Sequence, residues 1–265
     1  MWNKIKRKLK KKKALRYAAY VSGVAVFIVL IIVVLKETHI IKFDMLDNVI
    51  SEDPKSDDKA DTRKVPKIDL DVRLLTPNKY SRPQIALDQV NAVVVHYTAN
   101  PGTDAVENRN YFNNLPNINK NREEKSYVSS HFVIGLDGDI VQCVPLSEMA
   151  YASNDRNSDT VSIECCHRKK SGIFEDETYD ALMELLAYLC IRYDLDPDKD
   201  IIRHYDITGK LCPKYYVDNP ESWEQLKRDA RDKRDKTVAA IKAGKKEYEL
   251  FDNTGTKIKE GEQGE

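Results

Sequence analysis

The first part of this sequence lacks acidic residues, and the next part lacks charge of either sign. None of the first sixteen residues is acidic, whereas nine are Lys or Arg. The formal net charge of zero therefore conceals an uneven distribution, because setting these nine aside leaves 34 basic residues against 43 acidic ones. A basic cluster confined to one end is typical of a membrane-topology signal. We do not interpret it as a nucleic-acid binding surface, and nucleic acid is not an expected partner.

No charged residue interrupts residues 17–35, which are rich in Val, Ile and Ala. At about 1.5 Å per residue, this apolar run matches a hydrocarbon core about 30 Å thick. No small-x-small cleavage site follows Leu35, which disfavours a cleaved signal peptide, and the basic flank disfavours a buried core helix. We predict a basic cytoplasmic segment at 1–16, one transmembrane anchor at 17–35, and an extracytoplasmic location at the plasma membrane for the rest.

Large apolar residues are nearly missing from Ser51 to Lys67, which instead carries many charges and two prolines. Such a segment cannot bury enough surface to fold alone. Residues 36–67 are therefore expected to form a flexible linker with an r.m.s. span of about 30 Å. This linker would tether a folded domain near the membrane.

The chain has only five cysteines, and an odd number excludes complete pairing in intramolecular disulfides. Cys143, Cys165, Cys166 and Cys190 lie within or beside apolar segments, so we expect small buried hydrophobic residues at these positions. Cys165 and Cys166 are adjacent, but a strand would direct them to opposite faces, which disfavours a redox pair. Cys212 has a different context, described below.

No internal repeat is visible, and residues 68–230 have the pattern of one folded domain. Its expected strands are 90–96, 131–136, 140–144 and 160–166, with a tight turn at Asp137-Gly138 joining the second to the third. Its expected helices are 104–114, 176–194 and one that begins at Asn219-Pro220. This mixture predicts an α/β domain with a central mixed β-sheet flanked by helices. Residues 231–265 are expected to form a charged tail with a weak strand-turn-strand pattern at 248–258, and the sequence leaves open whether this tail is an appendage or disordered.

A candidate metal site comes from two separated segments. His204 and Cys212 lie eight positions apart around a glycine turn, and His96 ends the apolar run Val93-Val94-Val95. A lone histidine at a strand end is more often structural than a ligand, but the combination with Cys212 favours a metal. Two imidazoles and one thiolate leave a fourth position for water, which is the arrangement of catalytic zinc.

Four segments in this order resemble a known family. They are His96-Tyr97-Thr98, Ser130-His131-Phe132-Val133-Ile134, Val161-Ser162-Ile163-Glu164, and the stretch from His204 to Cys212-Pro213. Together they resemble the zinc-dependent N-acetylmuramoyl-L-alanine amidases of the type-2 amidase superfamily, which also includes phage endolysins and peptidoglycan recognition proteins. The resemblance covers roughly residues 78–230. It implies hydrolysis of the amide between N-acetylmuramic acid and L-alanine in peptidoglycan.

The resemblance assigns roles to five residues. His96, His204 and Cys212 match the zinc ligands, Glu164 matches the acid that activates water, and Lys210 matches a lysine that stabilises the oxyanion. Chemistry supports these roles, because a carboxylate at the end of an apolar strand favours a raised pKa and a fixed cation stabilises developing negative charge. The alternative for Glu164 is a strand glutamate paired with a surface lysine. The alternative for Lys210 is a solvated lysine in a turn.

One departure from part of the family concerns Ser130. Some members have a catalytic tyrosine at that position, and Tyr127 is three residues away. The chain therefore resembles the glutamate-using bacterial and endolysin branch, and the expected activity depends on Glu164.

Other polar residues have weaker assignments. We expect His131 to be structural or substrate-facing, and His167, which precedes three basic residues, to lie on a solvated loop. Asp206 would either orient a ligand imidazole or serve as a turn or cap residue. Candidate substrate-groove residues are Tyr97, Asn113 and Asn154.

The primary hypothesis is thus a membrane-anchored, outward-facing zinc amidase whose partner is peptidoglycan. A non-catalytic peptidoglycan-binding module of the same fold is the alternative, although such modules are expected to have lost a ligand and this chain retains Cys212. A structural zinc site in a membrane tether is a third possibility, disfavoured by three ligands instead of four.

Overall fold

The structure is a computed structural model that describes residues 62–258. The expected cytoplasmic segment, the expected anchor at 17–35 and the linker up to residue 61 lie outside the described residues. From residue 62 to residue 258, no helix has the length and apolar character that crossing a membrane requires.

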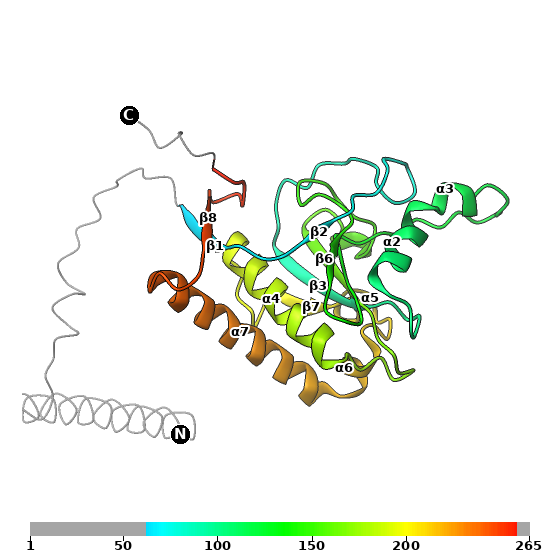
Figure 1. Ribbon diagram of the computed structural model, residues 1–265. Helices are drawn as coiled ribbons and strands as arrows, with labels where there is room; N and C mark the ends of the chain where they lie inside the picture. The colour runs from blue at the N-terminus through cyan, green and yellow to red at the C-terminus, as the bar shows by residue number, and fades with distance from the viewer. Residues whose placement is uncertain (1–61, 259–265) are drawn as a thin grey trace, which may run out of the picture. The chain divides into compact units, whose positions relative to one another are not determined.

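A six-stranded mixed sheet forms the centre of the domain, as predicted (Figure 1). Its strands, in spatial order, are β2 (Asp71–Val72), β5 (Ile140–Gln142), β4 (Phe132–Ile134), β6 (Thr160–Cys165), β3 (Ala92–Tyr97) and β7 (Ile201–Arg203). Only β4 and β5 pair antiparallel, through the predicted tight turn, in which Gly138 has a φ of 84°. The other neighbouring pairs are parallel. Parallel strands are normally covered on both faces, which explains their nearly continuous apolar sequences.

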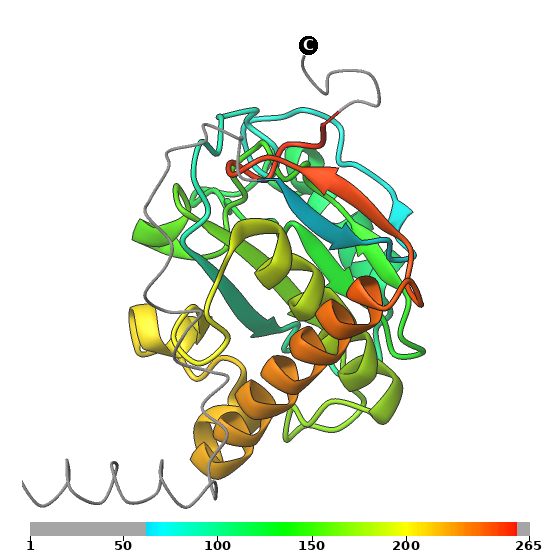
Figure 2. The same ribbon diagram turned by 90° about the vertical axis from the view of Figure 1, so that its left-hand side faces the viewer.

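One face of the sheet packs against two long helices, α4 (Asp176–Tyr193) and α7 (Pro220–Lys242), which lie side by side in Figures 1 and 2. Alternate residues of β3 and β6, including Val93, Val95 and Ile163, point into this layer and are completely buried. Leucines of α4 complete the same core. Each buried side chain of this size contributes about 1.5–3 kcal/mol to folding.

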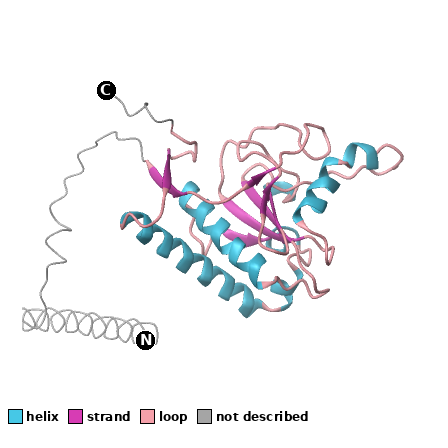
Figure 3. Cartoon of the chain, viewed as in Figure 1, coloured by secondary structure: helices cyan, strands magenta, loops and turns pink. Residues whose placement is uncertain are grey.

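The opposite face over β4 and β5 is covered by α2 (Ala105–Asn113), which is followed by the short α3 (Leu115–Ile118). Asp104 begins α2 with a capping box, because its side chain accepts from the Glu107 backbone amide while the Glu107 carboxylate accepts from Asp104. Figure 3 shows that long loops accompany this helix on the side of the sheet away from α4 and α7. Over β3 and β6, this face carries the polar residues His96, Ser162 and Glu164, and His96 and Glu164 belong to the candidate site.

The chain ends of the domain form a second, two-stranded sheet. β1 (Arg63–Pro66) pairs antiparallel with β8 (Tyr248–Phe251), which lies in the part of the tail where the sequence showed only a weak strand pattern. The last helix begins at Pro220 as predicted but continues to Lys242, so the boundary expected near Ala230 falls inside it. Arg192 of α4 lies 4.4 Å above the ring of Phe251, joining this sheet to the helical layer.

Candidate metal centre

The candidate ligands are brought together by the parallel ends of three neighbouring strands. His96 lies in β3 and is the register partner of Glu164 in β6, while Val95 is paired with Arg203, the last residue of β7. His204 follows directly. Functional groups in open α/β sheets gather at the carboxyl ends of strands for this topological reason. Because side chains alternate, His96 and Glu164 point to the face opposite α4 and α7.

Cys212 reaches the cluster through a tight turn. His204 begins a short helix, α5 (His204–Thr208), which ends at Gly209 with a φ of 74°. The backbone amide of Tyr205 donates to the carbonyl of Cys212 at 2.9 Å and closes the loop. Helix α6 (Lys214–Asp218) follows at once. The glycine turn noted in the sequence thus returns the cysteine to the histidine.

The three candidate ligands meet. One ligand atom from each of His96, His204 and Cys212 lies within 4.8 Å of the others, and all three residues are buried. The Cys212 Sγ atom is 3.7 Å from Nδ1 of His96, and the two imidazole centroids are 4.7 Å apart. Nδ1 is thus the His96 nitrogen that faces the Cys212 thiol. In His204, the Nε2 atom lies 3.1 Å from Oδ1 of Asn154.

Burial controls the protonation of the imidazoles. It lowers the pKa of His96 well below its usual value, and the neighbouring His204 and Lys210 lower it further. Burial also lowers the pKa of His204, with a smaller contribution from Lys210. Both rings are consequently neutral at pH 7, which is the form that binds a metal ion.

Burial has the opposite effect on the pKa values of the Cys212 thiol and the Glu164 carboxyl. Burial raises the pKa of the Cys212 thiol to about 12, and the nearby Glu164 adds to this effect. Burial also raises the pKa of Glu164 to about 8, against the opposing charge of Lys210. In the metal-free protein both groups therefore hold their protons at neutral pH, and a bound cation would displace the thiol proton.

Two polar atoms of this cluster have unmet hydrogen-bonding capacity. Within residues 62–258, neither Nε2 of His96 nor Oε2 of Glu164 has a hydrogen-bond partner, although both atoms are buried. Such atoms are costly to bury and are unusual in folded proteins. Together with two neutral imidazoles and a thiol, the donor set fits a tetrahedral zinc ion with one position left over.

Lys210 influences the cluster from the solvent side. Its side chain is exposed, and its charge lowers the pKa of His96, His204, Glu164 and Cys212. The lysine is therefore close enough to stabilise negative charge at the same place.

His131 has the structural role that was one of its two expected alternatives. It is 1% exposed, its Nδ1 lies 3.1 Å from the Ser162 hydroxyl, and its Nε2 lies 2.9 Å from the backbone carbonyl of Glu148. Burial lowers its pKa to about 4. Both ring nitrogens are occupied, so this imidazole joins the hairpin to β6.

The prediction that His167 lies on a solvated loop is wrong. The residue is 1% exposed, its ring stacks on Tyr97 with centroids 5.1 Å apart, and its Nδ1 contacts the carbonyl of Lys169 at 2.8 Å. The three basic residues that follow do reach solvent. The side chain turns inward because Tyr97 offers it an aromatic face.

The remaining candidates are placed as follows. Asp206 caps α5 by pairing with Arg203, which is the second of its two expected roles. Asn113 accepts from the backbone amide of Thr76 at 2.8 Å. The contact between Asn154 and His204 was missed, because fifty positions separate the two residues and no motif joins them. The four cysteines at 143, 165, 166 and 190 are buried and unpaired, as expected.

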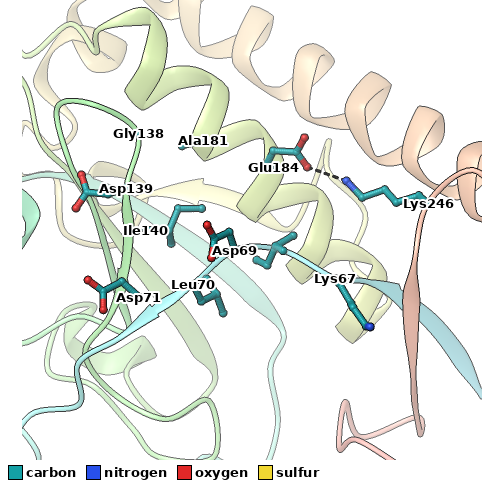
Figure 4. Close-up of a pocket in the computed structure, with 11 residues that line it drawn as sticks. Lys67, Asp69, Leu70, Asp71, Gly138, Asp139, Ile140, Ala181, Glu184 and Lys246 are labelled. Carbon is teal, nitrogen blue, oxygen red and sulfur yellow. Dashed lines mark hydrogen bonds and ion pairs between the residues drawn. The ribbon is translucent and has the colours of Figure 1, made fainter.

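A surface pocket of about 400 Å³ lies elsewhere on the domain (Figure 4). It is bordered by the segment that enters β2, the hairpin turn and α4, and Glu184 pairs with Lys246 at 3.3 Å on its rim. Its lining includes charges of both signs but none of the cluster residues.

Comparison with known proteins agrees with this geometry. Residues 86–215 match the N-acetylmuramoyl-L-alanine amidase family. The amidase BlyA of Bacillus subtilis (strain 168) is 33% identical over 170 residues, which cover 57% of this chain and 43% of the relative. The amidase CwlL of Bacillus licheniformis is 32% identical over 200 residues, which cover 71% of this chain and 53% of the relative. The chain thus spans about half the length of the curated relatives it matches.

Solved structures share the fold. The catalytic domain of XlyA superposes with a TM-score of 0.51 at 24% identity, covering 62% of this chain and 99% of that domain. PlyL gives a TM-score of 0.51 at 21% identity, covering 62% and 97%. At these identities the likeness concerns the fold alone. From the sequence match and the clustered segments, residues 86–215 of this chain belong to the N-acetylmuramoyl-L-alanine amidase family of the type-2 amidase superfamily.

Proposed function

We propose that this protein is a zinc-dependent N-acetylmuramoyl-L-alanine amidase, which hydrolyses the amide between the lactyl group of N-acetylmuramic acid and L-alanine in peptidoglycan. The observation that carries the proposal is the convergence of His96, His204 and Cys212 within 4.8 Å, beside a half-buried Glu164 whose Oε2 atom is buried. These groups come from three segments of the chain, and each has the chemical type that metal-assisted hydrolysis needs.

His96, His204 and Cys212 would hold the ion. When bound, zinc lowers the pKa of a coordinated water to about 7 and polarises a carbonyl. The burial of the three ligands supports this role, because neutral imidazoles bind without first losing a proton. Binding displaces the proton of the Cys212 thiol, so metal affinity should rise with pH.

Glu164 is the proposed general base and acid. It takes a proton from the attacking water, whose oxygen bonds to the carbonyl carbon, and it returns that proton to the alanine nitrogen as the C–N bond breaks. Burial raises the pKa of Glu164 to about 8, and positive charge from Lys210 opposes the shift. A bound divalent cation would lower this pKa further towards neutrality, where a group can both accept and donate protons.

Lys210 is the proposed electrostatic stabiliser. As water attacks, negative charge develops on the carbonyl oxygen, and a fixed cation beside it lowers the barrier. The Lys210 ammonium group already acts on all four neighbouring groups of the cluster. Because this side chain is exposed, its contribution should be smaller than that of Glu164.

The proposal includes the glutamate-using mechanism. Ser130 stands at the position of a catalytic tyrosine in some family members, and here its hydroxyl is buried and donates to the carbonyls of Phe132 and Ser162. Tyr127 is 53% exposed and packs against Tyr80, with ring centroids 5.4 Å apart. This arrangement supports Glu164 as the acid-base residue.

The decisive experiment is mass spectrometry of a defined muramyl-peptide incubated with the full-length protein, zinc-loaded and chelated in parallel. We expect zinc-dependent release of a stem peptide with L-alanine at its amino terminus. Binding of the muramyl-peptide without release, by a folded and zinc-loaded protein, would instead support the non-catalytic binding module. Wall binding that persists after chelation, again without release, would support a structural zinc site.

We also propose that residues 17–35 anchor the protein in the plasma membrane with the amidase domain outside. The uncharged run and its basic flank support this topology. Deletion of residues 1–35 should move the protein from the membrane fraction to the soluble fraction in a fractionated cell. Protease added to intact, wall-free cells should digest the full-length protein's domain but leave the N-terminal segment protected. A domain protected from protease would contradict the orientation.

A further inference from the structure

The second ring nitrogen of His204 is occupied by an asparagine from a distant loop. Asn154 Oδ1 lies 3.1 Å from Nε2 of His204, whereas the other candidate histidine, His96, keeps its Nε2 buried without a partner among the described residues. An amide oxygen is only an acceptor, so Nε2 must carry the hydrogen. The His204 lone pair is then on Nδ1, the nitrogen left for the cluster.

The backbone of Asn154 is held in an uncommon conformation. Its φ is 51°, in the left-handed region that few residues other than glycine adopt, although asparagine tolerates it better than most. It begins a single 3₁₀ turn, η1 (Asn154–Arg156). Strain of this kind persists only where the surroundings impose it, and it frequently accompanies a functional contact.

Hydrogen bonds inside the loop impose this conformation. The Asn157 side-chain oxygen accepts from the backbone amides of Ala152 at 3.0 Å and Ser153 at 2.6 Å, and the backbone amide of Asn157 donates to the Asn154 carbonyl at 3.0 Å. These bonds fix both flanks of Asn154. An exposed asparagine is therefore presented on a rigid turn.

The same turn is attached to the sheet. Arg156 forms two hydrogen bonds to the Asp159 carboxylate, at 2.7 and 2.8 Å. The Thr160 hydroxyl, at the start of β6, donates to the Arg156 carbonyl at 2.6 Å. Strand β6 also carries Glu164, so one rigid segment places both Glu164 and Asn154.

We propose that Asn154 is a positioning residue, whose Oδ1 accepts the Nε2 hydrogen of His204 and so directs the Nδ1 lone pair of that imidazole to the metal. This inference rests on the proposed zinc function. Metal-binding histidines generally need such an acceptor to fix tautomer and ring orientation, and its loss lowers metal affinity by about 10–100-fold. Here the acceptor is a neutral amide on a loop fifty residues away in sequence.

The test compares Asn154→Gly, Asn154→Asp and wild type in the full-length protein. Glycine removes the acceptor while accepting the positive φ, so the loop should keep its shape. Aspartate keeps an acceptor at the same position. Asn253→Gly, at another exposed asparagine, is the matched control. Zinc affinity is measured by competition with a chromophoric chelator, and the His204 tautomer by long-range ¹H–¹⁵N NMR of the metal-free protein.

We expect wild-type His204 to be the Nε2–H tautomer. Asn154→Gly should give a mixture of tautomers and lower zinc affinity by about 10–100-fold, while Asn154→Asp and Asn253→Gly stay within about 3-fold of wild type. An unchanged tautomer and zinc affinity in Asn154→Gly would overturn the proposal. So would a raised KM with zinc affinity intact, because Asn154 would then be a substrate contact.

Failure of the proposed function is distinguishable from failure of this inference. If the wild type itself binds no zinc, the amidase proposal and the metal part of this inference fall together. The tautomer of His204 in the metal-free protein still decides whether Asn154 controls that ring. Asn154→Gly that unfolds is recognised by its NMR spectrum, and the wild-type tautomer then decides, because a His204 ring protonated at Nδ1 in the metal-free protein would overturn the proposal.

Discussion

Two positions of strand β6, two residues apart on the same face, place their side chains in contrasting polar environments. At Ser162, the hydroxyl, the His131 ring and the Ser130 hydroxyl satisfy one another through hydrogen bonds. At Glu164, the described part of the chain offers Oε2 no partner, and the neighbouring His96 leaves Nε2 equally unpaired. Burial is therefore a poor guide to function on this face. At these two positions, unmet hydrogen-bonding capacity is what distinguishes the candidate binding centre from the structural polar network.

The largest effect should come from removing one proposed zinc ligand. His96→Ala tests directly whether the Glu164 side of this face serves metal binding and not stability. We expect loss of bound zinc and a fall in kcat/KM of about 10⁴-fold, because the proposed reaction needs several kcal/mol of charge stabilisation from the metal. The free energy of unfolding of the metal-free protein should change by only about 1 kcal/mol, since the lost imidazole carried an unpaired buried atom. Elemental analysis, muropeptide kinetics and denaturant unfolding measure the three quantities. Retained zinc and activity would remove His96 from the site.

Glu164→Gln should have the next largest effect. It removes the proton acceptor but keeps the volume, so kcat/KM should fall by about 10³-fold while zinc stays bound. Burial raises the pKa of Glu164 to about 8, so the metal-free protein already holds this side chain neutral at pH 7. The unfolded chain ionises this carboxyl at pH 7, whereas the metal-free folded protein keeps it protonated, so the neutral amide should raise the free energy of unfolding by about 3 kcal/mol. Muropeptide kinetics beside zinc analysis check this, with Ser162→Ala as the control on the same strand face. Comparable loss of activity in both variants would mean that the strand, not the carboxylate, is responsible.

His131→Ala should have the opposite effects to those expected for His96→Ala, with a large loss of stability and little change in bound zinc or activity. Its ring fills a fully buried position and makes hydrogen bonds through both nitrogens, so removal should lower the free energy of unfolding by about 3 kcal/mol. Bound zinc and the kcat/KM of the folded protein should stay within a factor of about 3. Urea unfolding and kinetics measure both. If His131→Ala does not fold, His131→Gln, which keeps polar atoms in place, should recover stability, and loss of zinc in that variant would contradict a purely structural role.

Local sequence patterns predicted some of these features and could not predict others. Strands β3 and β6 and helix α4 were predicted because periodicity and turn signals are local properties. The clustering of His96 with His204 was predicted from the spacing of His204 and Cys212 and from the histidine that ends an apolar run. The inward position of His167 depends on the ring of Tyr97, and local charge pointed the other way. The pairing of β1 with β8 joins opposite ends of the domain, so no local pattern could specify its register.

The smallest expected effect is the pH dependence of the free energy of unfolding that His131, in the hydrogen-bonded network around Ser162, contributes. Burial lowers the pKa of His131 to about 4, against about 6.5 in an unfolded chain, with Glu148 acting weakly in the opposite direction. Between these values the unfolded state binds more protons, so stability from this group is complete above about pH 6.5 and decreases as pH falls towards 4. From pH 7.5 to 5.5 the loss should be about 1.4 kcal/mol. His96 and His204 have lowered pKa values too, so the signal is the difference in unfolding free energy between wild type and His131→Gln at each pH. A difference that stays constant over this range would show that the folded protein protonates His131 as readily as the unfolded chain does, and that its hydrogen bonds do not hold the ring neutral.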